Sequence, residues 1–305
     1  MKKRFLSLVA FVLLLTLSVS LVSCFFNTAD EKDEESFTLD SVPEFDGKRA
    51  YVVINDNKPF FDEDEIVSKS YEKYAALDSL GRCGVAIACV GKDIMPTEER
   101  GSIGQVKPSG WHTVKYDIVD GKYLYNRCHL IGYQLTGENA NKGNLITGTR
   151  YLNIEGMLDF ENMIADYVKD TGNHVMYRVT PIFDGENLLA NGVLMEAYSV
   201  EDNGAGIEFC VYAYNAQPGV IIDYANGNSA LSGEEIKPDE NEGDEIPDEI
   251  EGEKLLYVLN KSSKKFHLPD CSSVNTIAEA NREDRETTKG ALIDEGYKPC
   301  GSCKP

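Results

Sequence analysis

The chain has 305 residues, and its 51 acidic against 30 basic side chains give a formal net charge of −21 at pH 7. Taken as a whole, this excess of negative charge argues against a polyanionic partner such as a nucleic acid. The charge is uneven, however, because residues 92–150 hold 8 basic and 6 acidic side chains, so a phosphate-binding face is permitted there.

The first 24 residues read MKKRFLSLVAFVLLLTLSVSLVSC. A basic start, an apolar run and a small-residue cleavage site are typical of an export signal, so residues 1–23 are predicted to be a signal peptide. The Leu-Val-Ser-Cys ending resembles the lipobox of bacterial lipoproteins. That resemblance implies lipidation of Cys24, with enough acyl chains to anchor the protein at the extracellular face of the cell membrane. An uncleaved membrane anchor with an incidental cysteine is the alternative.

Two acidic stretches divide the rest of the chain. Residues 24–36 form a polar tether with little to bury, and residues 233–253 hold 11 acidic side chains and one lysine. Both are interpreted as solvated linkers. They predict a large domain at residues 37–232 and a small one at residues 254–305. A domain of about 50 residues usually needs a metal or disulfides to compensate for its small core.

The large domain is predicted to be α+β, with an antiparallel sheet. Alternation of apolar and polar residues is typical of half-buried antiparallel strands. The predicted strands are residues 50–55, 84–91, 174–183, 192–200 and 207–215. Two helices are expected, at residues 68–80 and 151–171, the second ended by Gly172 and Asn173.

Four cysteines are scattered through the large domain: Cys83, Cys89, Cys128 and Cys210. Cys83 and Cys89 are six residues apart and are expected on one face of one strand. Buried free thiols are the favoured interpretation of all four. Disulfides are the alternative, because an exported protein meets an oxidising environment.

The predicted helix at residues 151–171 carries two polar side chains within its apolar face. At 100° per residue, Asn153 and Glu161 fall among the apolar residues, while most charged residues fall opposite. A buried amide or carboxylate must be paired or must line a site. Simple helix-packing hydrogen bonds are the alternative for both residues.

The segments YLYNRCHLIGYQL and ENANKGNLITGTRYLN, followed by this helix, form a predicted β-turn-β-α unit. The unit brings Arg127, His129, Asn144, Asn153 and Glu161 toward one place. Phosphodiester hydrolysis needs such residues. A neutral imidazole can accept a proton from the attacking water, oxygen ligands can hold a hard divalent cation, and a guanidinium can bind phosphate.

The pattern NRCHL, NLITGTRYLN and a following Glu resembles the core of the DNA/RNA non-specific endonucleases. These are ββα-metal or His-Me finger nucleases with an Asp-Arg-Gly-His motif, and the likeness is strongest to their streptococcal membrane nuclease branch. It extends through GSIGQVKPSGW and EFCVYAYNAQPGVIIDYANG and covers most of residues 45–230. The spacings also agree, because Asn153 falls nine residues after Asn144, and Glu161 eight after Asn153.

This resemblance implies a role for each of the five residues. His129 corresponds to the general base and Asn153 to the sole direct protein ligand of the catalytic Mg²⁺. Arg127 corresponds to the motif arginine near the phosphate. Asn144 and Glu161 correspond to residues that support the water shell of the metal and the leaving group.

The sequence departs from the motif at two positions, where Asn126 replaces the aspartate and Cys128 replaces the glycine. Asn126 keeps the hydrogen-bonding shape but loses the charge. Because the base and the metal ligand are intact, the expected function is a Mg²⁺-dependent, sequence-non-specific endonuclease acting on DNA, with RNA as a second candidate substrate. A catalytically impaired surface protein that binds nucleic acid is the alternative.

The small C-terminal domain contains four candidate zinc ligands, His267, Cys271, Cys300 and Cys303, separated by three, 28 and two residues. A paired Cys-Gly-Ser-Cys knuckle with a distant His and Cys is typical of a closed tetrahedral zinc site. The pattern resembles the zinc-binding domain of the Ada DNA-repair protein, which implies a small α/β zinc fold without methyl transfer. A disulfide from Cys303 to Cys300 or Cys271, with a spectator His, is the alternative.

Overall fold

The computed structural model describes residues 37–237, 254–303 and 305. The predicted signal peptide, Cys24, the tether and most of the acidic linker lie outside these residues. None of the helices within the described part of the chain is long and apolar enough to cross a membrane.

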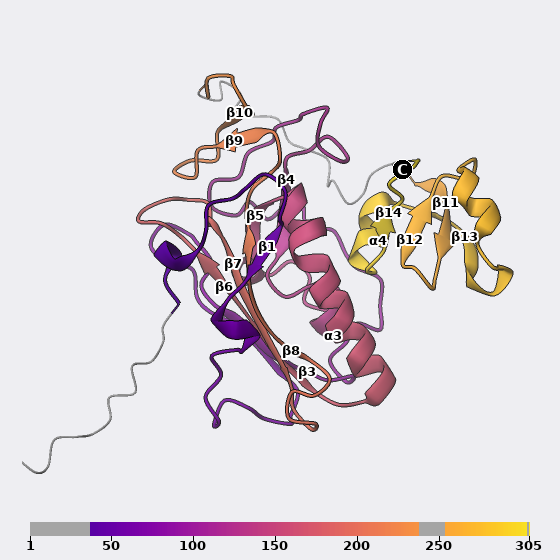
Figure 1. Ribbon diagram of the computed structural model, residues 1–305, viewed down its shortest axis with the longest axis horizontal. Helices are drawn as coiled ribbons and strands as arrows, with labels where there is room; N and C mark the ends of the chain where they lie inside the picture. Colours follow the sequence, from indigo (N-terminus) through magenta and orange to yellow (C-terminus); the bar gives the residue numbers. More distant parts are fainter. Residues whose placement is uncertain (1–36, 238–253, 304) are drawn as a thin grey trace, which may run out of the picture. The chain divides into compact units, whose positions relative to one another are not determined.

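Six strands form an antiparallel sheet in the order β1-β8-β7-β6-β3-β2 (Figure 1). The strands are β1 (Tyr51–Val53), β2 (Tyr71–Tyr74), β3 (Ala86–Val90), β6 (Val175–Ile182), β7 (Gly192–Ser199) and β8 (Glu208–Tyr214). All of these except β2 fall inside the predicted ranges, and the predicted α+β class is confirmed.

The helix expected at residues 68–80 is wrong. Tyr71–Tyr74 forms strand β2, which pairs with β3 at the edge of the sheet, and the chain after it is not helical. The free edge of β3 offers backbone donors and acceptors that a neighbouring strand can satisfy, whereas a helix there would leave them unpaired. β2 has only four residues, too few for sequence periodicity to reveal the strand.

The helix expected at residues 151–171 is confirmed, in two parts. Leu152–Met157 forms a π-helix, and α3 (Leu158–Thr171) continues from it. Gly172, with a φ of 74°, ends α3 in the left-handed conformation that glycine adopts without strain. α3 lies along one face of the sheet (Figure 1), and its apolar side chains share a buried core with those of β3, β6, β7 and β8.

The predicted β-turn-β-α unit is present. Strands β4 (Tyr125–His129) and β5 (Leu145–Thr149) form an antiparallel pair, and α2 (Tyr133–Thr136) lies in their connection. Fully buried Asn215 ties this unit to the end of β8, because its amide donates to the carbonyls of Thr147 and Ala190 and accepts from the Thr149 N–H. The unit therefore has a fixed position against the sheet.

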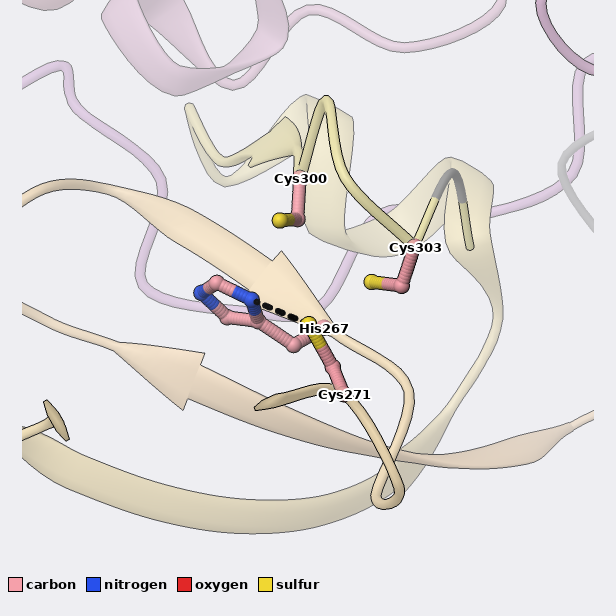
Figure 2. A group of neighbouring side chains, drawn as sticks. All are labelled: His267, Cys271, Cys300 and Cys303. Atoms are coloured by element: carbon pink, nitrogen blue, oxygen red, sulfur yellow. Dashed lines mark hydrogen bonds between the residues drawn. The ribbon is translucent and has the colours of Figure 1, made fainter. Parts of the chain in front are cut away.

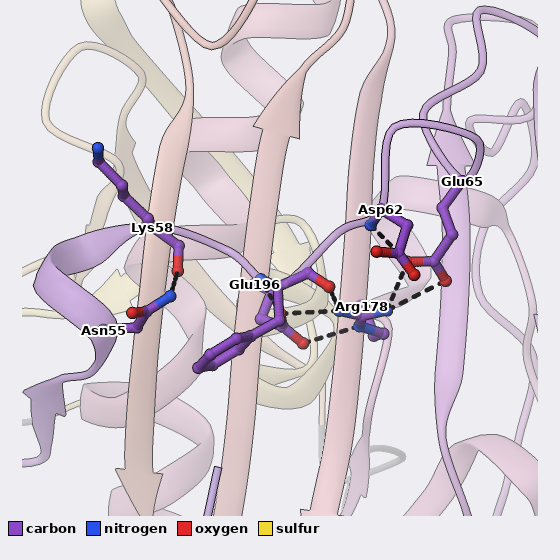
Figure 3. Close-up of polar contacts among 7 residues, drawn as sticks. Asn55, Lys58, Asp62, Glu65, Arg178 and Glu196 are labelled. Atoms are coloured by element: carbon purple, nitrogen blue, oxygen red, sulfur yellow. Dashed lines mark hydrogen bonds and ion pairs between the residues drawn. The ribbon is translucent and has the colours of Figure 1, made fainter. Parts of the chain in front are cut away.

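A buried ion-pair network holds the segment before β2 against the sheet (Figure 3). Arg178 of β6 lies 2.8 Å from a carboxylate oxygen of Glu196 on β7 and 3.1 Å from one of Glu65. Glu196 also accepts the N–H of Phe60. Because Glu196 is almost fully buried, these partners are needed to compensate for its lost hydration.

The remaining strands of the large domain are β9 (Val220–Ile222) and β10 (Ser229–Leu231), which form a hairpin. The C-terminal part has its own four-stranded sheet in the order β13-β11-β12-β14. Its elements are β11 (Leu255–Asn260), β12 (Lys265–His267), β13 (Arg282–Thr287), α4 (Lys289–Asp294) and β14 (Lys298–Pro299). Tyr257, Phe266 and Leu292 are among the few apolar side chains buried in this part.

Cys83, Cys89, Cys128 and Cys210 are buried free thiols, as predicted. Cys83 lies before β3, however, so it does not share a strand with Cys89. Its Sγ lies 3.1 Å from each of two backbone carbonyls, those of Lys142 and Leu145. The Cys83 thiol therefore helps to hold the start of β5 beside the sheet.

Candidate active site and metal centre

His129 is the last residue of β4, and 8% of its surface is exposed. Its Nε2 lies 2.8 Å from the backbone carbonyl oxygen of Asn139. A carbonyl oxygen can only accept, so Nε2 carries the proton and donates it. In the neutral ring Nδ1 then has a free lone pair, which is the atom a general base needs.

The surroundings of His129 keep its ring neutral. Burial and, less strongly, the positive charge of Arg100 together lower the pKa of His129 to about 3, against a smaller opposite effect of the Asn139 carbonyl. The imidazole is therefore unprotonated at every pH at which the protein would work. The neutral ring has the lone pair that a general base needs, but so low a pKa also makes it a weak base, because a general base works best with a pKa near the working pH.

His129, Asn153 and Glu161 line one pocket, together with Gly132 and Tyr133. They come from three elements, β4, the π-helix and α3, and the strand pair and core described above hold those elements together. π-helical turns occur frequently at functional sites. The convergence expected from the sequence is therefore present for these three side chains.

Glu161 is buried and its carboxylate is held at the start of α2. Its Oε1 accepts the N–H of Gly132 at 3.0 Å. A Cβ at position 132 would lie 2.4 Å from Oε2, so only glycine lets the backbone approach the carboxylate this closely. Glu161 thus has a fixed orientation at the pocket wall.

Asn153 accepts a hydrogen bond from the Cys128 thiol, with 3.3 Å between Sγ and Oδ1. An amide oxygen has two lone pairs, so one remains for a cation. Amide and carboxylate oxygens are the protein ligands that suit Mg²⁺. The donor set of Asn153 and Glu161 therefore fits a hard divalent cation.

Arg127 and Asn144 do not line this pocket. The Arg127 guanidinium donates to the carbonyls of Val106 and Gly104 at 2.6 and 2.8 Å and stacks on Trp111. Asn144 is fully buried, and its amide both accepts from and donates to the backbone of Ile131. In the structure these contacts fix the loop before β4 and the end of the β4–β5 pair.

The two motif departures lie two residues apart on β4. Asn126 is half-buried, and its Nδ2 lies 3.4 Å from the carbonyl oxygen of Tyr125. Cys128 points toward the π-helix. The first removes the charge that the motif aspartate would carry, and the second changes what contacts Asn153.

Arg100 is a site residue that sequence reasoning missed. It is half-buried, and its charge is close enough to His129 to lower the pKa of that residue. The available signal was a basic side chain directly before the GSIGQVKPSGW segment. Nothing local in the sequence indicates that this segment folds beside β4.

The C-terminal part brings His267, Cys271, Cys300 and Cys303 together, as predicted (Figure 2). Their ligand atoms all lie within 4.8 Å of one another, and Cys271 Sγ lies 3.6 Å from His267 Nδ1. Ligand atoms of a tetrahedral site with Zn–S bonds of about 2.3 Å are spaced similarly. Cys271, Cys300 and Cys303 are free thiols in the structure, which therefore does not show the disulfide of the alternative interpretation.

The ionisation of this cluster is uneven. Burial raises the pKa of Cys300, but hydrogen bonds from the backbone of Cys303 and Ser302 outweigh it and lower that pKa to about 7. Burial raises the pKa of Cys303 to about 11 and lowers that of His267. A thiol that ionises near neutral pH beside a neutral imidazole is a good starting point for zinc binding, since both ligands must be deprotonated.

Residues 63–201 match the family model for DNA/RNA non-specific endonuclease. A deoxyribonuclease of Streptococcus dysgalactiae subsp. equisimilis is 31% identical over 145 residues. That alignment covers 44% of this chain and 43% of the streptococcal protein, so the chain spans less than half of that relative.

Solved structures show the same fold. NucA from Streptococcus agalactiae, with a magnesium ion bound, is 27% identical with a TM-score of 0.52, covering 59% of this chain and 86% of NucA. The Sda1 nuclease with a bound zinc ion is also 27% identical, with a TM-score of 0.52, covering 60% of this chain and 97% of Sda1. Residues 63–201 thus match the DNA/RNA non-specific endonuclease family, and the nuclease resemblance inferred from the sequence is confirmed.

Proposed function

We propose, from the DNA/RNA non-specific endonuclease domain at residues 63–201, that this protein hydrolyses phosphodiester bonds of DNA, with RNA as a second candidate substrate. In this proposal it is a Mg²⁺-dependent enzyme with little sequence preference, exported and anchored by lipid at the cell surface. The observation that carries the catalytic part is the convergence of His129, Asn153 and Glu161 on one pocket.

His129 acts as the general base in this proposal. Its Nδ1 takes a proton from the water that attacks phosphorus, while the Nε2 hydrogen bond to Asn139 keeps the ring in the required tautomer and orientation. As the proton arrives the ring becomes cationic next to Arg100. That proximity makes the imidazolium a strong acid, so it releases the proton readily after the reaction.

Asn153 would hold the Mg²⁺ through Oδ1, and Glu161 would orient water around it from the pocket wall. When bound, such an ion neutralises charge on the scissile phosphate and on the leaving oxygen. Arg100 adds a positive charge beside the base, where a phosphate oxygen could be held. Arg127 and Asn144 support this site through the loop and strand contacts described above.

A surface protein that binds nucleic acid without cutting it is the second candidate function, and Asn126 is the feature that favours it. Asn126 lacks the negative charge of the motif carboxylate. The intact base, metal ligand and carboxylate favour catalysis instead.

Plasmid cleavage distinguishes the two functions. The full-length protein is expected to convert supercoiled plasmid to nicked and linear forms in Mg²⁺ and to leave it intact in EDTA, because the hard cation is needed to neutralise the phosphate. The same assay with single-stranded RNA tests the second substrate. A protein that retards plasmid in a gel but does not nick it in Mg²⁺ would support the binding function.

The cluster of His267, Cys271, Cys300 and Cys303 is proposed to hold one structural Zn²⁺. The closed set of four side chains leaves no open position for a substrate, which is the arrangement of a structural rather than a catalytic zinc site. The metal would compensate for the small core of residues 254–305. It would take no part in phosphodiester hydrolysis.

Lipid anchoring is proposed from the lipobox-like ending at Cys24. A Cys24→Ala variant expressed in a bacterial host is expected to lose membrane retention, because it has no thiol to accept the acyl chains. The measurement is partition into detergent after phase separation, with Ser23→Ala as the matched control that keeps Cys24. Detergent partition of Cys24→Ala equal to that of the parent would contradict lipidation.

A further inference from the structure

We propose that Cys128 is a positioning residue for the metal ligand Asn153, acting through the hydrogen bond from its thiol to Asn153 Oδ1. This inference rests on the proposed function of Asn153 as ligand. The motif that this chain resembles has glycine at this position, so the contact is a feature of this sequence and not of the motif.

The thiol is placed between two parts of the π-helix. Cys128 lies on β4 and is 1% exposed. Its Sγ is 3.3 Å from Asn153 Oδ1 near the start of the π-helix and 3.6 Å from Met157 Sδ at its end. A single buried side chain thus contacts both ends of the segment that presents the ligand.

The chemistry of this contact selects the orientation of the amide. Burial in apolar surroundings keeps a thiol protonated, and a protonated thiol is a weak hydrogen-bond donor. Its proton satisfies one lone pair of Oδ1 and turns Nδ2 away, which leaves the second lone pair of the same oxygen for a cation. Among the described residues, the hydrogen bond from Cys128 is the one that the structure records for the Asn153 side chain.

The opposite strand fixes the Cys128 side chain. A Cβ added at Gly148 of β5 would lie 2.5 Å from Cys128 Cβ and 3.2 Å from its Sγ. Only one of the two positions can therefore carry a side chain, and in this chain it is position 128. The thiol cannot move toward β5 without this glycine, and it cannot move away from β5 without meeting Asn153 and Met157.

The alternative is that Cys128 only fills space in the core. Both roles predict some loss of stability when the sulfur is removed. They differ in what happens to metal affinity, because a space-filling side chain needs only volume, whereas the positioning role needs a donor. Outer contacts that orient a ligand typically change metal affinity by about 10- to 100-fold.

The experiment measures Mn²⁺ binding without nucleic acid, by electron paramagnetic resonance, on full-length protein whose C-terminal site has first been loaded with zinc. Asn153→Ala defines the signal of the active site, since the acidic surface binds Mn²⁺ elsewhere. Cys128→Ala is expected to weaken the Asn153-dependent binding of Mn²⁺ about 10-fold. This is the low end of the range of about 10- to 100-fold for outer contacts, because thiols are weak hydrogen-bond donors. Cys128→Ser, which keeps a donor, is expected to stay close to the parent.

Cys210→Ala is the matched control, because it removes a buried thiol from β8 and leaves the pocket unchanged; it is expected to bind Mn²⁺ as the parent does. Thermal unfolding without metal verifies that each variant folds. If Cys128→Ala does not fold, Cys128→Gly, which introduces the glycine of the motif, is measured in its place.

Parental affinity in Cys128→Ala, or equal weakening in Cys128→Ala and Cys128→Ser, would overturn the positioning role. A parent that binds no more Mn²⁺ than Asn153→Ala would overturn the proposed function of Asn153, and this inference with it.

Discussion

His129→Ala is expected to nick supercoiled plasmid about 10²- to 10⁴-fold more slowly than the parent protein, the usual effect of losing a general base. The substitution removes the Nδ1 acceptor but leaves Asn153 and Glu161 in the pocket. DNA binding should persist and should weaken with salt, because it depends on cationic contacts to phosphate. The measurement is the initial nicking rate in Mg²⁺ at matched protein concentration, with folding checked by circular dichroism.

Added imidazole is expected to restore part of the activity of His129→Ala, because a small base can enter the space that the side chain leaves. Asn153→Ala should not respond to imidazole and should instead need more Mg²⁺. His174→Ala is the matched control, since His174 pairs with Glu201 at the surface and lies outside the pocket. Nicking by His129→Ala at the parental rate would show that His129 is not the base.

The pH profile gives an independent check of His129. Its pKa of about 3 means that the base is unprotonated from neutral pH down to about pH 4. A lowered pKa loses the active form only at lower pH, so kcat/KM of the parent should show no acid limb near pH 6.5. An acid limb centred there would indicate a solvent-exposed histidine as the base instead.

Replacing Cys300 and Cys303 together by serine is expected to abolish zinc binding and unfold residues 254–305. The parent, purified with reductant, should contain about one zinc per chain, held by four ligands. Structural zinc contributes about 10–16 kcal/mol in zinc-finger peptides, more than the small core of this part can replace. Zinc is measured by mass spectrometry, and the folding of residues 254–305 by their resistance to limited proteolysis.

A control double variant, Cys89→Ala with Cys210→Ala, removes two buried thiols from the central sheet. It is expected to keep its zinc, because neither residue belongs to the C-terminal cluster. A parent without zinc and with an oxidised cysteine pair would refute the zinc site and support the disulfide alternative.

Local patterns in the sequence were enough for most of the fold. Strands β1, β3, β6, β7 and β8 follow from their apolar patterning, and β7 and β8 are buried on both faces. Gly172 marks the end of α3 because the left-handed conformation there favours glycine. Strand β2 could not be predicted, because its four residues are too few to show a periodic pattern and its identity depends on pairing with the edge of β3.

Part of the candidate site could likewise be predicted from the sequence, and part could not. The spacing of His129, Asn153 and Glu161 is a property of one β-turn-β-α unit, so their convergence could be predicted from the chain alone. The four residues of the C-terminal cluster could also be predicted, because the spacing of cysteine and histidine residues reflects the geometry of a tetrahedral metal site.

Only the tertiary structure decided what the other site residues contact. Arg127 meets the carbonyls of Gly104 and Val106, Asn144 meets Ile131, and Arg100 lies beside His129. The contacts of Arg127 and Arg100 join the β-turn-β-α unit to a segment outside it, whereas the contacts of Asn144 and the Nε2 hydrogen bond that sets the tautomer of His129 lie within the unit. The sequence thus determined which residue types are present and their spacing within one unit, while packing against the rest of the chain determined the partners of Arg127 and lowered the pKa of His129.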